Sequence, residues 1–200
     1  MPRPDASSAT VFMVEAPATL SGNGLGIPES AVVPLVKALR GAGALEAAVL
    51  TSNDRTECYV VAATAEEARL VVAGALGRLL GADAGGIAPS LVIQQGQAAA
   101  RHLFRLACGL ESLVLGDGQL RQAYDAAHAA HAAGPLVRRV FHAAMAARVR
   151  ASAIAAGLRS PAREDTTADG ESEIEAAIEA EIASLDEWRV RRDAFAMLLA

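Results

Sequence analysis

The stretch Ala47–Ala62, AAVLTSNDRTECYVVA, decides the predicted fold because it contains two apolar runs on either side of a short polar turn. Residues 47–50 and 57–62 predict two strands, and the polar residues 52–55 predict a tight connection between them. Strands joined this closely pair antiparallel, because a parallel pair needs a long crossover. We therefore expect an antiparallel hairpin here.

The segments on either side of the hairpin alternate between strand and helix patterns. Residues 10–15 and 91–93 are short apolar runs that predict a first and a last strand. An apolar periodicity after Pro28 predicts a helix, and Pro34 either kinks this helix or delays its start. A second helix is expected over residues 65–80.

A capping box marks the start of this second helix, because Thr64 is followed three residues later by Glu67. The complete order is strand, helix, strand, strand, helix, strand. This order predicts an α+β fold, in which helices cover a small antiparallel sheet with a ferredoxin-like arrangement. Beyond the sheet, helical patterns over residues 97–108, 117–132 and 135–156 predict a helical subdomain.

These patterns predict one domain followed by a separate helix. The composition from Gly157 to Gly170 favours a linker, and apolar side chains recur beyond it at spacings of three and four. The expected organisation is residues 1–157 as the domain (sheet part 10–95, helical part 97–157), residues 158–170 as the linker and residues 171–200 as a long amphipathic helix.

An amphipathic helix at the end of a chain needs a partner surface for its apolar seam. The seam here consists of Ile174, Ile178, Ile182, Leu185 and Trp188. Two partners are open. The helix either pairs with a second copy of the chain, which would make a homodimer, or packs back on its own domain.

The composition is that of an ordinary globular protein. The chain has 200 residues, is 52% hydrophobic, carries a formal net charge of −5 and contains no run of 18 consecutive apolar residues. Its two cysteines, Cys58 and Cys108, are isolated, so neither a disulfide framework nor a zinc site is expected. We expect a cytoplasmic protein without a membrane span.

Two motifs carry a resemblance to a known family. The hairpin turn reads TSNDRTE over residues 51–57, and a glycine-flanked segment reads GLESLVLGDGQ over residues 109–119. Their content and order closely resemble the N-terminal domain of glutamyl-tRNA reductase, a family of tetrapyrrole (5-aminolevulinate, porphyrin, haem) biosynthesis. The substrate-binding positions that this resemblance implies are Ser52, Asn53, Asp54, Arg55, Ser112, Asp117, Gly118 and Gln119.

The resemblance also implies that the catalytic nucleophile is missing. In the family a cysteine of the turn attacks the glutamyl ester, and NADPH reduces the resulting thioester; Asn53 stands at that position here. An amide nitrogen is a very poor nucleophile, because its lone pair is delocalised. Cys58 does not fit as a substitute, since it lies five positions further on and faces the opposite side of the predicted strand. We expect Cys58 to be a buried packing residue.

Two further residues have a functional and a structural interpretation. Arg55 matches the family's arginine that contacts the glutamyl substrate, and a turn arginine paired with Asp54 or Glu57 is the alternative. His102 matches a histidine thought to support activity, and a helix histidine satisfied by a neighbouring carbonyl is its alternative.

The second motif departs from the family's pattern in two ways. Gly118 replaces a proline, and four residues are missing between Gln119 and Tyr124. Depending on where the gap is placed, Gln119 corresponds to the first or to the second of two substrate-contacting glutamines. One of the two is lost in either case.

Cofactor sites are expected to be few. Nothing after Gly157 resembles the family's Rossmann domain, so no NADPH is expected to bind this chain. Scattered histidines leave haem as an alternative ligand, through His128, His131 or His142.

Basic side chains form a strip that faces either tRNA phosphates or solvent: Arg138, Arg139, Arg148 and Arg150.

We therefore expect a non-catalytic binding or regulatory homologue of glutamyl-tRNA reductase that is inactive as a reductase on its own. Its expected partners are glutamyl-tRNA or a full-length reductase. One alternative is half of a split NADPH-dependent glutamyl-tRNA reductase, in which a Rossmann-domain protein supplies the cofactor site. The other is a sensor of haem or of another small ligand.

Overall fold

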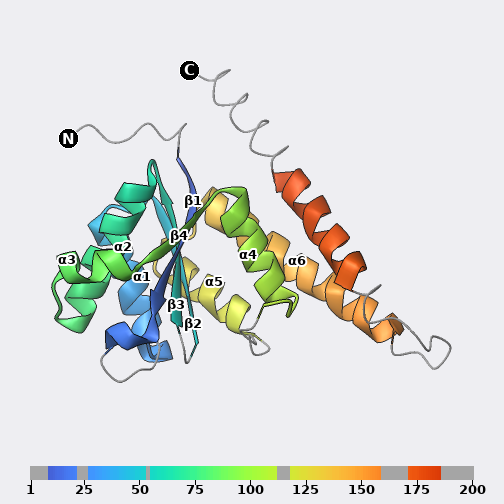
Figure 1. Cartoon of the computed structure of the whole chain (residues 1–200), viewed down its shortest axis with the longest axis horizontal. Coiled ribbons are helices and arrows are strands. Elements are labelled where there is room, and N and C mark those ends of the chain that lie inside the picture. Colours follow the sequence, from blue (N-terminus) through green and yellow to red (C-terminus); the bar gives the residue numbers. More distant parts are fainter. Residues whose placement is uncertain (1–8, 22–26, 53–54, 112–117, 159–170, 186–200) are drawn as a thin grey trace, which may run out of the picture. The chain divides into compact units, whose positions relative to one another are not determined.

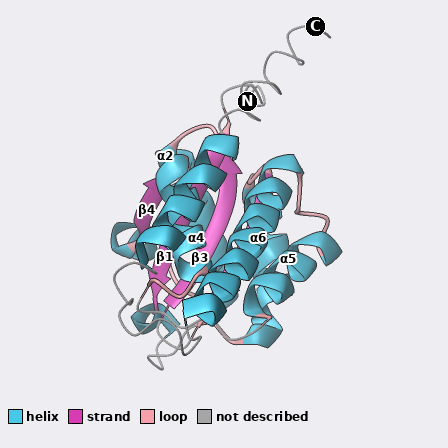
Figure 2. Cartoon of the chain, turned by 90° about the vertical axis from the view of Figure 1, so that its right-hand side faces the viewer, coloured by secondary structure: helices cyan, strands magenta, loops and turns pink. Residues whose placement is uncertain are grey.

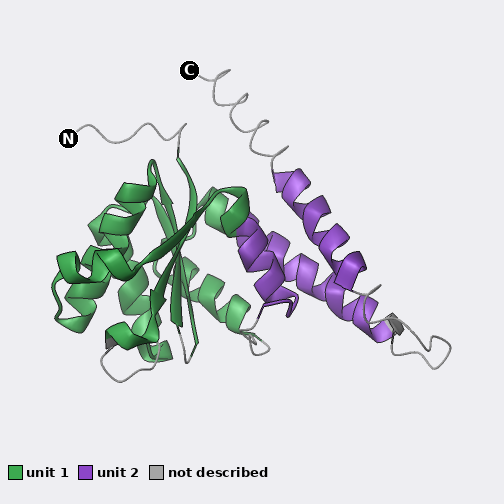
Figure 3. Cartoon of the chain, in the orientation of Figure 1, with its two compact units in different colours: residues 1–99, 116–138 green, residues 100–115, 139–200 purple. Residues whose placement is uncertain are grey.

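The computed structural model describes residues 9–21, 27–52, 55–111, 118–158 and 171–185. Its contacts divide the chain into two units, which Figure 3 shows in different colours. The first unit comprises residues 1–99 and 116–138, and the second comprises residues 100–115 and 139–200.

The first unit is built on a four-stranded antiparallel sheet (Figure 1). The strands are β1 (Thr10–Pro17), β2 (Glu46–Thr51), β3 (Arg55–Ala62) and β4 (Val92–Gln95), in the order β2-β3-β1-β4. Each strand pairs antiparallel with its neighbours, and β2 and β3 form the hairpin expected from the sequence. The α+β fold and its ferredoxin-like strand order are therefore confirmed.

Two helices pack on one face of this sheet, α1 (Val32–Ala42) and α2 (Ala65–Leu80), followed by the short α3 (Ala84–Ile87). Alternate strand residues point towards these helices, because successive side chains of a strand face opposite sides. The resulting core includes Phe12, Val14, Val49, Cys58 and Val60 from the strands and Leu35, Leu39, Val72 and Leu76 from the helices.

The two helix starts follow from their local sequences. Thr64 Oγ1 accepts a hydrogen bond from Glu67 N at 3.1 Å, which confirms Thr64 as the N-cap, and the Glu67 carboxylate reaches back to the preceding residue, accepting from Ala63 N at 2.9 Å. A 3-10 turn over Glu29–Ala31 precedes α1, so that Pro34 lies in the first helical turn, where its missing N–H has no partner to lose. Of the two expectations for Pro34, the delayed start is the one observed.

The outer edge of β2 is covered by the connection between α5 (Gln119–Ala129) and α6 (Pro135–Leu158). Ala47 N donates to the Ala132 carbonyl at 3.0 Å, which satisfies a donor that an edge strand would otherwise expose. Helix α5 also packs against β2 and α1, so it belongs to the first unit.

Glu46 of β2 anchors the start of α6. Its carboxylate, on a residue that is 8% exposed, accepts hydrogen bonds from Leu136 N at 3.2 Å and Val137 N at 2.7 Å. A negative charge at this end of a helix is also favoured by the helix dipole. Gly134 leaves room for this contact, since a Cβ at this position would displace the Glu46 side chain.

The second unit contains most of α4 (Gln97–Ala107), most of α6 and a helix over residues 171–185. Figure 2 shows α4 and α6 as coiled cyan ribbons, turned by 90° from Figure 1. Ile178 and Ile182 of the terminal helix are 0% and 4% exposed. Polar contacts tie this helix to α4 and α6, so the described part shows it packed on its own chain. Pairing with a second copy stays a prediction, and residues 159–170 of the expected linker and Trp188 lie outside the described residues.

No single helix in the described ranges has the length and apolar composition needed to cross a membrane. Helix α2 and residues Ala84–Ser90 together have the length and apolar composition of a membrane span, but they are bent by 120° relative to each other. Much of α2 belongs to the core on the sheet.

Candidate functional site

The β2–β3 hairpin is closed by two hydrogen bonds at the base of its turn. Ser52 donates to the Arg55 carbonyl from its backbone N–H at 3.0 Å and from its hydroxyl at 3.2 Å. These bonds hold together the two ends of the turn in which the sequence predicts a substrate site. Asn53 and Asp54, at its tip, lie outside the described residues.

The chain before α1 is tied to the same end of the hairpin. Thr51 and Thr56 are cross-strand partners, and both contact Ile27. Thr56 Oγ1 accepts from Ile27 N at 3.1 Å, whereas the Thr51 hydroxyl donates to the Ile27 carbonyl. This pair of threonines explains why the segment leading to Glu29 begins beside the hairpin.

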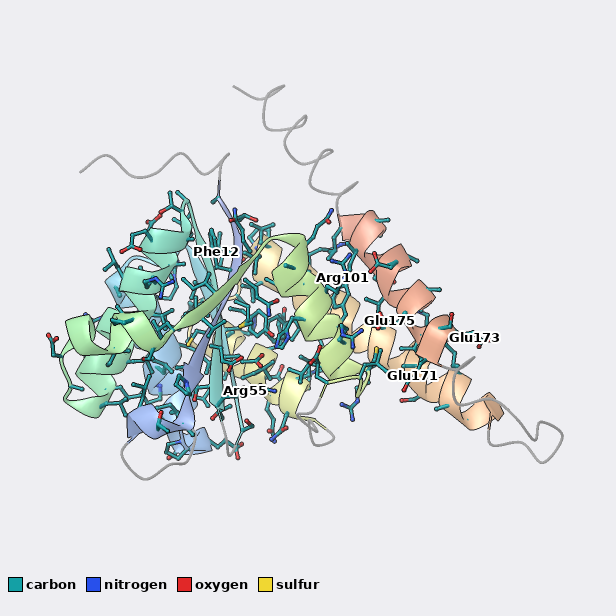
Figure 4. The ribbon with its side chains drawn as sticks, in the orientation of Figure 1. Phe12, Arg55, Arg101, Glu171, Glu173 and Glu175 are labelled. Carbon is teal, nitrogen blue, oxygen red and sulfur yellow. The ribbon has the colours of Figure 1, made fainter. Side chains whose placement is uncertain are left out.

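Arg55, labelled in Figure 4, occupies the first position of β3 and lies close to two carboxylates. Its guanidinium lies 3.4 Å from Glu57 Oε1 and 3.8 Å from Glu15 Oε2, and its side chain is 17% exposed. The buried Nε atom has no hydrogen-bond acceptor among the described residues. The pairing with Glu57 is the structural alternative expected from the sequence, and Glu15 is a partner that the sequence pattern did not indicate.

Glu57 is itself buried and held by a neighbouring phenol. Its side chain is 1% exposed, and Tyr59 donates a hydrogen bond from its hydroxyl to Glu57 Oε2 at 2.8 Å. Burial, with the nearby Glu57 charge as a smaller cause, raises the pKa of Tyr59 well above its ordinary value of 10.0. The raised pKa extends into alkaline solution the pH range over which Tyr59 is protonated and can donate this hydrogen bond.

A pocket of about 180 Å³ opens between the end of β2, the start of α1 and α5. This volume is below the range of roughly 300–1,000 Å³ typical of drug-sized ligand sites, so it fits a group the size of an amino acid. Its polar lining comes from Glu29, Thr51, Gln119 and Gln122, and its apolar lining from Val32, Val33, Val49, Leu50, Ala123 and Ala126. The pocket brings Gln119 of the second motif beside the strand that leads into the first.

Gly118 sets the start of α5 and hence the position of Gln119. Its φ of +98° lies in the left-handed region, which glycine adopts without a Cβ penalty. Ser112 and Asp117, two other predicted binding residues, lie outside the described residues.

Three polar residues of this pocket were not among the binding positions predicted from the sequence: Glu29, Gln122 and Thr51, which directly precedes the predicted turn residues. Gln122 lies three positions after Gln119, and residues three apart share one face of a helix. Its role could have been inferred from that spacing. Glu29 carries no comparable signal, because its position depends on the threonine contacts to Ile27.

Both thiols of the chain lie within the described residues. Cys58 is 0% exposed on the core side of β3, and burial raises its pKa from 9.0 to about 12, with the Glu57 charge adding to the shift. Cys108 follows α4 in the second unit, where partial burial raises its pKa against the opposing charges of Arg150 and Arg148. Neither thiol forms a reactive thiolate readily at neutral pH.

His102, His128 and His142 lie on helices, whereas His131 lies in the turn between α5 and α6 with a φ of +54°. His102 is half-buried on the part of α4 that belongs to the second unit, whereas the hairpin and the pocket belong to the first. His128, His131 and His142 are exposed, and His128 stacks on Tyr124 with ring centroids 6.3 Å apart. In the described ranges, no three His, Cys, Asp or Glu side chains are grouped as metal ligands.

Two arginines of the expected basic strip contact the terminal helix. Arg150 forms an ion pair with Glu181, and Arg139 donates to the Ser184 hydroxyl at 3.1 Å.

Comparison with known proteins agrees with this geometry. Residues 21–153 match the family model described as "Glutamyl-tRNAGlu reductase, N-terminal domain". The glutamyl-tRNA reductase of Roseiflexus castenholzii is 38% identical over 110 residues, which cover 53% of this chain and 26% of that protein. The glutamyl-tRNA reductase of Chloroflexus aggregans is 39% identical over 127 residues, covering 60% and 28% respectively.

A solved structure, the glutamyl-tRNA reductase from Methanopyrus kandleri, has the same fold with a TM-score of 0.52 at 24% identity. The match covers 72% of this chain and 34% of that chain. The chain thus spans about a quarter of the length of the two bacterial relatives. Because the family match extends over most of the chain, this protein belongs to the glutamyl-tRNA reductase N-terminal domain family.

Proposed function

We propose that this chain is a binding homologue of the glutamyl-tRNA reductase N-terminal domain in tetrapyrrole biosynthesis, and that it holds glutamyl-tRNA without forming the thioester. The proposal has two parts. The chain provides no thiol for acyl transfer, and it keeps a pocket for the glutamyl group.

The placement of the two thiols carries the first part. A thioester requires an accessible thiolate, and the resemblance puts Asn53 where the family's cysteine attacks. Cys58 lies in the core with a pKa raised to about 12, on the face of β3 towards α1 and α2. Cys108 is half-buried with a raised pKa and belongs to the other unit.

The pocket beside β2 supports the second part. Its volume of about 180 Å³ fits a group the size of an amino acid. The amide groups of Gln119 and Gln122 can donate to the carboxylate of a glutamyl group, and the Glu29 carboxylate can accept from its ammonium. Gln122 thus offers a second amide despite the four residues missing after Gln119.

Equilibrium binding of glutamyl-tRNA, deacylated tRNA and a tRNA charged with another amino acid tests the second part. We expect the chain to prefer glutamyl-tRNA. Gln119→Ala or Gln122→Ala should weaken this preference by roughly tenfold to a hundredfold, the effect of losing a hydrogen bond to a charged group. Gln95→Ala is the matched control, because Gln95 is an exposed glutamine on β4 outside the pocket.

Equal affinity for all three tRNAs would contradict the binding proposal. A different outcome would favour the split enzyme. If the chain co-purifies with a Rossmann-domain protein and the pair reduces glutamyl-tRNA with NADPH, the chain contributes to catalysis. Loss of that activity in Cys58→Ser or Cys108→Ser would identify the thiol that replaces the missing nucleophile.

A further inference from the structure

The charges of the second unit are segregated by helix. Helices α4 and α6 contain six arginines and no aspartate or glutamate, whereas residues 171–185 contain five glutamates and no lysine or arginine. These five glutamates equal the formal net charge of the whole chain, −5. Such a separation of charge between helices is not needed for packing, which depends on apolar area.

The acidic helix contacts the arginine-bearing helices through matched pairs. Arg101 of α4 donates to both carboxylate oxygens of Glu179, at 2.8 and 3.0 Å. Arg105 pairs with Glu175 and also, at 2.9 Å, with Glu111 outside this helix; Arg150 pairs with Glu181, and Arg139 donates to the Ser184 hydroxyl. We call Arg101, Arg105, Arg139 and Arg150 the arginine face.

Fork-shaped contacts of this kind resemble the way arginine holds phosphate. A guanidinium presents parallel N–H groups that fit the two oxygens of a carboxylate or of a phosphate equally well. A row of glutamates on one helix can therefore occupy the positions that successive backbone phosphates would take. In Figure 4, Arg101 and Glu175 lie on facing helices of this unit, and Glu173 lies on the same helix as Glu175.

The ion pairs are exposed enough for a competing polyanion to replace them. The Arg101 and Glu179 side chains are 40% and 54% exposed, and those of Arg150 and Glu181 are 45% and 22% exposed. Exposed pairs contribute little to stability, because solvent and salt screen them. Ile178 and Ile182 can keep the helix attached while individual pairs open.

We propose that the arginine face is a phosphate-binding surface for RNA, and that the acidic helix 171–185 occupies it as a competitor within the chain. RNA and the glutamates then bind the same guanidinium groups, so neutralising a glutamate raises RNA affinity. The choice of tRNA as the RNA rests on the proposed function. The competition between RNA and the acidic helix for the arginine face does not depend on that function.

Deacylated tRNA is the appropriate probe, because it lacks the glutamyl group that the pocket would bind. We expect Glu179→Gln to raise its affinity for the full chain, and the triple variant Glu175→Gln/Glu179→Gln/Glu181→Gln to raise it roughly tenfold at low salt. The triple variant should also show a steeper loss of affinity with salt, since more phosphates are then neutralised.

Glu173→Gln is the matched control. Glu173 is an exposed glutamate on the same helix, and its substitution removes the same charge without an Arg101 contact. Adding Arg101→Gln to Glu179→Gln should cancel the gain, because the freed guanidinium is then absent. Far-ultraviolet circular dichroism of each variant checks that the helices are intact.

Two results would overturn the inference. The first is a gain of equal size in Glu173→Gln, which would mean that net charge alone controls RNA affinity. The second is a gain in Glu179→Gln that persists when Arg101 is replaced. Either result leaves the pocket proposal standing, because that proposal depends on discrimination between charged and deacylated tRNA.

Discussion

At the scale of single residues, Gly134 and Glu46 depend on each other. Gly134→Ala should destabilise the first unit by about 1–3 kcal/mol, because the added methyl group displaces the carboxylate that caps α6. Urea denaturation measures this change. Gly41→Ala is the control, since Gly41 lies in α1 with open space around its Cβ position, and should stabilise by about 0.5–1 kcal/mol. Equal effects of the two substitutions would contradict the role given to Glu46.

The buried thiol of Cys58 should make the free energy of unfolding decrease at alkaline pH. The thiol titrates near its ordinary pKa of 9.0 in the unfolded chain but near 12 in the folded chain, so the unfolded state releases its proton first. The protonated thiol makes its full contribution to the free energy of unfolding below pH 9.0. Above pH 9.0 this contribution decreases, by up to about 1.4 kcal/mol per pH unit.

Urea denaturation of the wild-type chain and of Cys58→Ala, between about pH 8 and 10.5, tests this linkage. Tyr59 contributes in the same direction in both proteins, because burial also raises its pKa. The difference between the two slopes therefore isolates Cys58. Identical slopes would show that Cys58 is not shielded from solvent in the folded state.

Asn53→Cys, which replaces the side-chain carboxamide with a thiol, tests whether a nucleophile at this turn position is enough for thioester formation. We expect this variant to acquire an acid-stable label from tRNA charged with radioactive glutamate, because a thiolate attacks the ester that an amide cannot. The label should be released by neutral hydroxylamine, which cleaves thioesters. Gln95→Cys, which places a new thiol at an exposed position on β4, should remain unlabelled.

At the scale of elements, the hairpin holds the start of α1 through two threonines. Thr56→Val should cost about 1–3 kcal/mol, because it leaves the buried Ile27 N–H without its acceptor while keeping the side chain's volume. Hydrogen exchange at the Ile27 amide should become faster. The exposed Thr19→Val is the control and should change stability by no more than about 0.5 kcal/mol. Unchanged exchange at Ile27 would contradict the anchoring role of Thr56.

The elements that the sequence predicts well are those whose signals are local. The hairpin at residues 47–62, the N-cap at Thr64 and the helix over Ala65–Leu80 all follow from residues that are neighbours in the chain. Contacts between elements that are distant in the sequence are not predicted in this way. The connection that follows α5 is held on β2 by the Ala47–Ala132 and Glu46–Val137 hydrogen bonds, each between residues more than eighty positions apart, and no periodicity in the sequence indicates these contacts.

The candidate site shows the same division. The motifs identify Arg55 and Gln119, and the structure adds Glu15 to the first and Glu29 to the second. Both additions come from tertiary contacts, the pairing of β1 with β3 and the fixing of Ile27 by Thr56. The sequence motif could not distinguish a substrate-binding Arg55 from a paired one, because an arginine fork suits either carboxylate.

At the scale of the whole molecule, the chain combines a domain of the reductase family, an asparagine at position 53, where the family resemblance implies a cysteine, and an acidic helix on its arginine face. These features agree with a protein that holds a charged tRNA and leaves it chemically unchanged. Binding without turnover is the central claim, and the fate of the glutamyl ester distinguishes it from catalysis.

The most direct measurement is the recovery of radioactive glutamate after the purified chain is incubated with charged tRNA at neutral pH. We predict that glutamyl-tRNA binds in preference to deacylated tRNA, that the ester decays at its rate in buffer, and that no acid-stable label appears on the wild-type protein. Label on the wild-type chain that is lost in Cys58→Ser or Cys108→Ser would contradict the account.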